Sequence, residues 1–195
     1  IGQKHQGLEI EGSMKLNDIV RLDGAVSFGK WKFDGDADGL YTEYDEETPK
    51  QTSYTYTLDG LFVGDQPQTA YVLGTTLTPM DGLRLQGIFK MYDKNYADWS
   101  PDSRELSGDA DRSQVWQAPG YNRLDLHAAY KLPKIAGYDM TLTGHLFNAL
   151  DAVYVQDAVD NSQYNGFGDK LHLAHNAEVF LGTPRYFNLG LTVNF

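Results

Sequence analysis

The last eleven residues of the chain, Arg185 to Phe195, carry the pattern that most constrains its fold. From Phe187 onward, apolar and polar side chains alternate without exception. One side of the alternation holds Phe187, Leu189, Leu191, Val193 and Phe195, and the other holds Asn188, Gly190, Thr192 and Asn194. A period of two residues is the period of a β-strand. The segment is therefore predicted to be a strand with one apolar and one polar face, ending on an aromatic residue.

The same alternation recurs in six further segments, which are 8–16, 20–28, 70–78, 83–92, 121–132 and 139–147. In 121–132, for example, every charged side chain falls on one face, opposite Leu124, Leu126 and Leu132. In 83–92, Ile88 is the misfit, because it falls among the polar side chains. Repeated strands with one charge-free apolar face are typical of a barrel embedded in lipid. The sequence therefore predicts an all-β, antiparallel transmembrane barrel with seven strands in this chain.

Composition excludes several other classes of protein. The chain has 16 basic and 27 acidic residues and a net charge of -11, which argues against a nucleic-acid partner because such a partner requires a basic surface. It has no cysteine, which excludes a disulfide scaffold and a thiolate metal site. No run of about 18 apolar residues occurs, so a transmembrane helix is excluded as well.

The connections between the predicted strands alternate between short and long. Residues 17–19, 79–82 and 133–138 are short connections, whereas 34–67, 99–120 and 157–184 are long ones. Bacterial outer-membrane barrels have short periplasmic turns and long extracellular loops. This alternation predicts that the C-terminus lies in the periplasm.

Several local sequences resemble one known family when they are read in order. They are VGDQPQT at 63–69, PMDGLRL at 79–85, NYADW at 95–99, PGYNRLDLHAAYKL at 119–132, LFNALD at 146–151 and the terminal RYFNLGLTVNF. Their order and spacing resemble the C-terminal barrel strands of TonB-dependent receptors of Gram-negative outer membranes. The family's usual Asn-Leu-Phe-Asp appears here as Asn148, Ala149, Leu150 and Asp151.

The resemblance implies a receptor that takes up a scarce ligand with energy coupled through TonB, and it implies no enzymatic activity. Barrels of this family have about 22 strands. We therefore expect residues 1–195 to be the C-terminal part of one barrel domain, without the plug domain. Two alternatives remain open from the sequence: a plug-less, porin-like or structural outer-membrane barrel, and a secreted soluble glycan-binding β protein.

The resemblance also implies roles for individual residues. The polar-face side chains expected to line the lumen are Arg84, Lys90, Arg123, Asp125, His127 and His145. The terminal strand resembles the signal read by the barrel assembly machinery, carried by Phe187, Leu189, Leu191, Val193 and Phe195. Expected partners are the TonB complex acting through a plug, the assembly machinery, the lipid bilayer and a surface lipoprotein.

One long connection carries a possible metal motif. The segment DGDADGLYTEYD at 34–45 has the D-x-D-x-D-G spacing of an EF-hand loop. Calcium prefers six to eight oxygen ligands, and the expected ligands are Asp34, Asp36, Asp38, Leu40, Thr42 and Asp45. The alternative is an acidic loop exposed to solvent. The sequence leaves both interpretations open.

Overall fold

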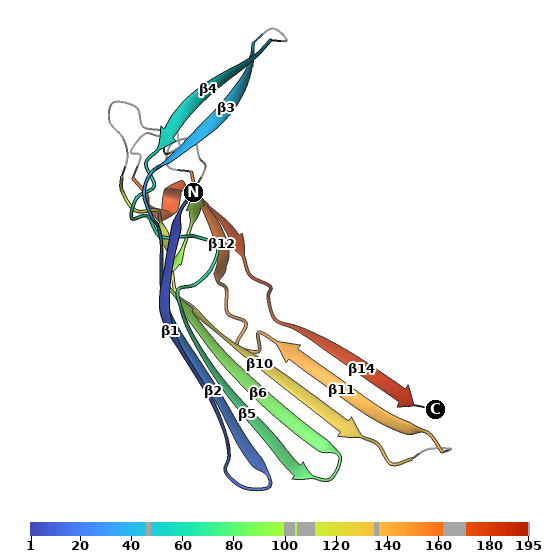
Figure 1. The fold of residues 1–195 in the computed structure, drawn as a ribbon. Helices are drawn as coiled ribbons and strands as arrows, with labels where there is room; N and C mark the ends of the chain where they lie inside the picture. Colours follow the sequence, from blue (N-terminus) through green and yellow to red (C-terminus); the bar gives the residue numbers. More distant parts are fainter. Residues whose placement is uncertain (46–47, 100–103, 105–111, 135–136, 162–170, 195) are drawn as a thin grey trace.

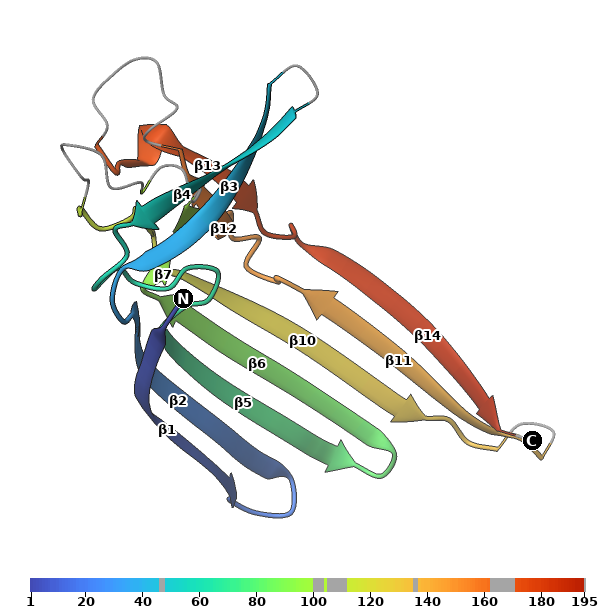
Figure 2. The ribbon, with the colours of Figure 1, turned by 45° about the horizontal axis from the view of Figure 1, so that its top comes forward.

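Seven long strands form one antiparallel sheet in the computed structural model, which describes residues 1–45, 48–99, 104, 112–134, 137–161 and 171–194 (Figure 1). The strands are β1 (Gln3–Lys15), β2 (Val20–Phe33), β5 (Thr69–Met80), β6 (Leu83–Asp93), β10 (Tyr121–Lys131), β11 (Asp139–Phe147) and β14 (Tyr186–Asn194). They lie side by side in that order (Figure 2). Each coincides with one of the seven predicted segments, so the antiparallel all-β prediction is confirmed.

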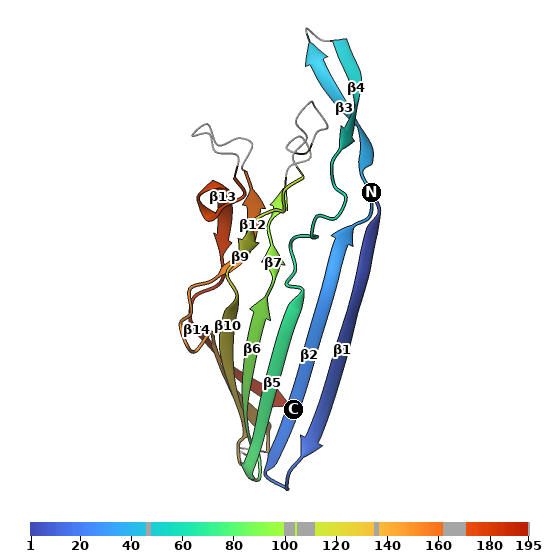
Figure 3. The ribbon, with the colours of Figure 1, turned by 90° about the vertical axis from the view of Figure 1, so that its left-hand side faces the viewer.

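The long connections contain short strands of their own. A hairpin of β3 (Ala37–Asp45) and β4 (Thr48–Tyr56) projects beyond the sheet (Figure 3). The others are β7 (Asn95–Tyr96), β8 (Asp98–Trp99), β9 (Gln117–Ala118), β12 (Val155–Asp160) and β13 (Ala177–Leu181), with a short 3-10 helix, η2 (Ala174–Asn176). These elements gather at one end of the sheet, and the short turns lie at the other (Figure 3). None of the described residues forms a helix long and apolar enough to span a membrane.

The strand register aligns apolar side chains into rows that cross the whole sheet. One row runs through consecutive paired residues, which are Met14, Leu22, Thr75, Gly87, Leu126, Leu146 and Phe187. Side chains of this face are widely exposed: Leu126 is 40% exposed, Leu142 47% and Leu191 58%. Asp125, which belongs to the opposite face, is only 2% exposed. This distribution is the reverse of that in a soluble protein, and so large an exposed apolar face calls for an apolar environment.

A small aromatic core lies beneath the long connections. Its buried members are Leu58, Leu61, Tyr96, Trp99 and Val115. Phe62 stacks on Tyr96 with ring centroids 4.2 Å apart, and Phe33 at the end of β2 meets Trp99 edge-on at 5.6 Å. This core fixes the base of the β3–β4 hairpin against the end of the sheet.

The structure contradicts the loop conformation assumed for the predicted calcium site. Residues 37–45 form β3 and pair with β4 up to Asp45 and Thr48, so Leu40, Thr42 and Asp45 belong to a strand and not to an EF-hand loop. Asp38 accepts a hydrogen bond from the Thr55 hydroxyl at 2.7 Å. Within the described part of the chain, no group of three or more His, Cys, Asp or Glu side chains could hold a metal ion.

Asp36, another predicted calcium ligand, is instead the anion of a clasp between two connections. Arg112 donates two hydrogen bonds to its carboxylate, at 2.7 and 3.1 Å. The backbone N–H groups of Leu58 and Asp59 donate to the same carboxylate at 3.0 and 3.1 Å. These hydrogen bonds lower the pKa of Asp36 to about 2. Those from Arg112 are the largest cause, and the two backbone donors add to them.

Candidate functional site on the polar face of the sheet

The six polar-face candidates are brought onto one face by the strand register. Arg123 pairs with Lys90 and His127 with His145, while Asp125 and Arg84 follow the same alternation along β10 and β6. A polar row crosses six strands at the level of the histidines, through Arg21, Thr76, Gln86, His127, His145 and Asn188. The sequence therefore identified a set of side chains that the structure places together.

Asp125 is the centre of the densest polar contacts on this face. It accepts hydrogen bonds from the Lys90 ammonium and from the Arg123 guanidinium, each at 3.1 Å. It also accepts one at 3.0 Å from the backbone N–H of Asn148. Lys90 and Arg123 are about a quarter exposed. A nearly buried carboxylate is tolerable here because three donors, two of them cationic, replace its hydration.

Asn148 extends these contacts into the turn that follows β11. Its side-chain amide donates to the carbonyl oxygens of Ala152 and Thr183, at 2.9 and 3.2 Å, and accepts from the Ala152 N–H at 3.0 Å. Asn148 and Asp151 both have positive φ, 49° and 53°, which Asn and Asp tolerate better than most residues. Asp151 in turn accepts from the backbone N–H of Arg185, just before β14. The LFNALD segment thus anchors the chain on both sides of the last long connection.

A run of tyrosines lies at the end of the polar face nearest the long connections. Tyr92 and Tyr121 have ring centroids 5.1 Å apart, and Tyr154 stacks on Tyr121 at 4.3 Å. Arg123 donates to the Tyr154 hydroxyl at 3.1 Å, which joins the tyrosines to the Asp125 contacts. Gly182 is required beside this run, because a Cβ there would lie 1.9 Å from the Tyr154 ring. Sequence reasoning did not count Tyr154 among the polar-face candidates, since it lies outside the predicted strands.

His127 and His145 form a close pair of titratable side chains on this face. Their Nδ1 atoms are 2.8 Å apart. The Phe147 ring lies beside both, with centroid distances of 5.5 and 5.9 Å. The pair borders a hollow of about 370 Å³ that is also lined by Arg84 and Gln86.

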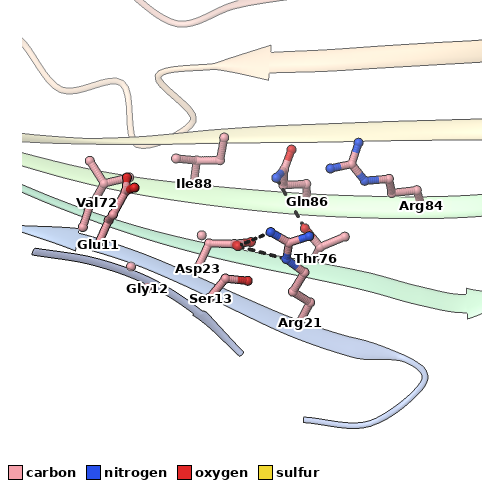
Figure 4. Close-up of a pocket in the computed structure, with 13 residues that line it drawn as sticks. Glu11, Gly12, Ser13, Arg21, Asp23, Val72, Thr76, Arg84, Gln86 and Ile88 are labelled. Carbon is pink, nitrogen blue, oxygen red and sulfur yellow. Dashed lines mark hydrogen bonds and ion pairs between the residues drawn. The ribbon is translucent and has the colours of Figure 1, made fainter. Parts of the chain in front are cut away.

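A second hollow, of about 800 Å³, extends over the polar side chains of β1, β2, β5 and β6 (Figure 4). Within it, Arg21 donates to Asp23 at 2.7 and 2.9 Å, and Gln86 donates to Thr76 at 3.3 Å. Arg84 lines both hollows. The polar face therefore offers open space bounded by charges of both signs.

Four of the five residues predicted as an assembly signal lie on the apolar face of β14. Phe187, Leu189, Leu191 and Val193 pair with Leu146, Gly144, Leu142 and Met140 of β11. Phe187 and Leu189 are 74% and 72% exposed. Phe195, the terminal aromatic, lies outside the described residues.

A sheet with one exposed apolar face and one charged, hydrogen-bonded face fits a membrane barrel wall, and comparison with known families agrees. Residues 1–149 match the model of the family described as "TonB dependent receptor-like, beta-barrel". The chain belongs to this family. TonB-dependent receptor barrels are transport proteins of the Gram-negative outer membrane, and the family is not an enzyme family. Membership thus confirms the predicted resemblance.

The chain can also be compared with individual proteins. It is similar to the solved structure of BauA, the ferric preacinetobactin receptor from Acinetobacter baumannii, with 16% sequence identity and a TM-score of 0.47. The match covers 99% of this chain and 29% of the BauA chain, so this chain spans less than a third of that protein's length. Among curated proteins, no match is found.

Proposed function

We propose that residues 1–195 form the C-terminal part of the barrel wall of an outer-membrane receptor that takes up a scarce ligand with energy coupled through TonB. The observation that carries this proposal is the two-faced sheet, with an exposed apolar face and a polar face held by Lys90, Asp125 and Arg123. Membrane barrels have an apolar exterior and a polar interior. Arg84, Lys90, Arg123, Asp125, His127 and His145 would accordingly line the lumen.

The proposal includes further strands beside this sheet. Among the described residues, β1 pairs only with β2, and β14 pairs only with β11. An unpaired strand edge in lipid would leave backbone N–H and C=O groups without hydrogen bonds, at several kcal/mol each. Each edge strand would therefore be paired with another strand in the membrane, which supports a wider barrel.

The proposed orientation places the long connections outside the cell. Outer-membrane barrels have long extracellular loops and short periplasmic turns. The β3–β4 hairpin and β12–β13 would then face the exterior, where a surface lipoprotein could cover them. The C-terminus would lie in the periplasm, because β14 ends beside the first residue of β11, at the end of the sheet that carries the short turns (Figure 2).

The remaining proposed partners act at the periplasmic side. The TonB complex would act through a plug domain inside the barrel, which the polar face would contact. The barrel assembly machinery would read the apolar face of β14, from Phe187 to Val193, together with Phe195. Neither the TonB complex nor the assembly machinery would require a catalytic residue of this chain.

The test is energy-dependent uptake by cells that produce the complete protein. Radiolabelled ferric siderophores, cobalamin and oligosaccharides serve as probes, each with and without a protonophore that removes inner-membrane energy. We expect one probe class to bind the cell surface in both conditions but to accumulate inside only in energised cells. Accumulation that is insensitive to the protonophore would favour the porin-like alternative and overturn energy coupling.

A further inference from the structure

We propose that His127 and His145 form a binding site for one divalent transition-metal ion, Cu(II) or Ni(II), on the polar face of the sheet. The two residues are direct partners in the β10–β11 register. Their Nδ1 atoms face each other at 2.8 Å. This site is independent of the uptake function proposed above, since it rests on the geometry of the two imidazoles alone.

The distance between the two nitrogens fits coordination of a single ion. Imidazole nitrogens bind such ions at about 2.0–2.1 Å, so two nitrogens at the right angle of a tetragonal Cu(II) or Ni(II) ion lie about 2.9 Å apart. The observed 2.8 Å is close to this value, so an ion can bind both nitrogens once the rings turn their Nδ1 lone pairs from the hydrogen bond toward the ion. The strand ladder fixes both backbones, and Phe147 packs beside both rings and stacks on Tyr186 at 4.7 Å. The two ligands are therefore held close to each other before an ion arrives.

The pair is accessible and has room for the rest of a coordination shell. The hollow beside it measures about 370 Å³, which accommodates several water molecules. Gln86 and Asn188 flank the pair in the same polar row. No further His, Cys, Asp or Glu of the described residues completes a group of three with the pair. Water, or the amide oxygens of these two neighbours, would fill the remaining positions.

The surrounding charges select the class of ion. Arg84 lines the same hollow and opposes any cation. Asp125, two residues from His127, is already held by Lys90, Arg123 and Asn148. The site thus lacks the free carboxylates that calcium and magnesium need. Binding must come from nitrogen donors, and imidazole suits copper and nickel, with copper(II) the strongest binder of the series.

The hydrogen bond between the rings must break when an ion binds both nitrogens. Without a metal, one Nδ1 must carry the proton that the other accepts. An ion that binds both nitrogens must displace that proton. The displaced proton moves to Nε2 of the same ring, so the pair binds an ion without a net loss of protons.

The experiment titrates the complete protein, purified in detergent, with Cu(II) and follows binding by calorimetry and electron paramagnetic resonance. In the wild type, the Cu(II) spectrum should show hyperfine splitting from two nitrogen ligands. His127→Gln and His145→Gln should each lose one bound ion per molecule or weaken its binding at least tenfold. His5→Gln is the matched control, because His5 stacks on Trp31 at 5.4 Å, away from the pair, and should bind as the wild type does.

A fourth variant separates a cation site from an anion site. Arg84→Gln removes a positive charge from the hollow and should tighten Cu(II) binding severalfold. Weaker binding in Arg84→Gln, or unchanged binding in both pair variants, would overturn the proposal. So would a wild-type Cu(II) spectrum without splitting from two nitrogens, and that readout does not depend on whether any variant folds.

Discussion

At the scale of single residues, the polar face is organised around a few side chains that each satisfy several partners. Asp125 accepts from Lys90, Arg123 and Asn148, and Asn148 continues the contacts to Ala152 and Thr183. The alternation along β10 predicted that Asp125 would point away from lipid. It could not predict the bond to Asn148, because that bond depends on the positive φ of a turn beyond the next strand.

Replacing Asp125 should destabilise the barrel. Asp125→Asn leaves Lys90 and Arg123 without their shared anion in a poorly hydrated place, which should lower the free energy of unfolding by about 1–3 kcal/mol. Urea unfolding of the complete protein in lipid vesicles measures this change. Asp18→Asn is the control: Asp18 forms an exposed pair with Lys15 in a short turn, and its loss should change the stability little. Equal effects of the two variants would contradict the central role given to Asp125.

The Asp36–Arg112 clasp should persist at mildly acidic pH. The pKa of Asp36 is lowered from 3.8 to about 2 in the folded chain. A carboxylate with a lowered folded pKa stabilises the fold above its unfolded pKa, and this stabilisation is lost as the pH falls through the folded value. Hydrogen-exchange protection of the Leu58 and Asp59 amides should therefore hold from pH 7 to about 4 and decline only toward pH 2.

Two variants check the same clasp at neutral pH. Asp36→Asn should reduce the protection of both amides, whereas Asp34→Asn, whose side chain is exposed, should not. Removing calcium with a chelator should leave the protection unchanged, because Asp36 is occupied by Arg112 and by two backbone donors. Protection that depends on calcium would instead restore the metal-loop hypothesis.

At the scale of elements, the strands that cross the sheet were predictable and the strands beyond it were not. The seven long strands each place apolar and polar side chains on opposite faces, and this period is visible in sequence. β3 and β4 show no such apolar face, because they project beyond the sheet and pair mainly with each other. The aspartate spacing of 34–45 therefore suggested a metal loop, while the strand pairing of 37–45 with 48–56 went unrecognised.

The two faces of β10 should differ sharply in their tolerance of charge. Leu126→Arg introduces a cation on the apolar face and should cost about 2–4 kcal/mol near mid-membrane. Ala129→Arg, on the polar face of the same strand, should cost much less. Both are measured by urea unfolding in vesicles. Similar costs would mean that the faces are assigned to the wrong environments.

The terminal strand should matter for assembly more than for transport. Deleting Phe195 removes the aromatic residue that follows β14 in the sequence, after the apolar Leu191 and Val193 of that strand. The amount of folded barrel in the outer membrane should fall, and the ligand affinity of the molecules that do fold should be unchanged. Heat-modifiable mobility of membrane fractions in gels measures the folded amount, and normal levels would remove this role.

At the scale of the whole molecule, the two faces of the sheet meet different environments. Asp125 is nearly buried while Leu191 is 58% exposed, and family membership explains this inversion as a barrel wall in a membrane. The sequence predicted this arrangement because lipid imposes the same demand on every strand. It could not predict the hollows beside Arg84 or the His127–His145 contact, because these depend on side chains that only the register brings together.

The most direct test is to place nitroxide labels on the two faces and measure their collisions with oxygen, which concentrates in lipid, and with a polar nickel chelate, which does not. The chain contains no cysteine, so it contributes no background to single labelling sites. Labels at positions 126, 142, 191 and 193 should collide mainly with oxygen, and labels at 127, 143 and 192 mainly with the chelate. A reversed pattern, or equal access to the chelate on both faces, would contradict the barrel-wall account.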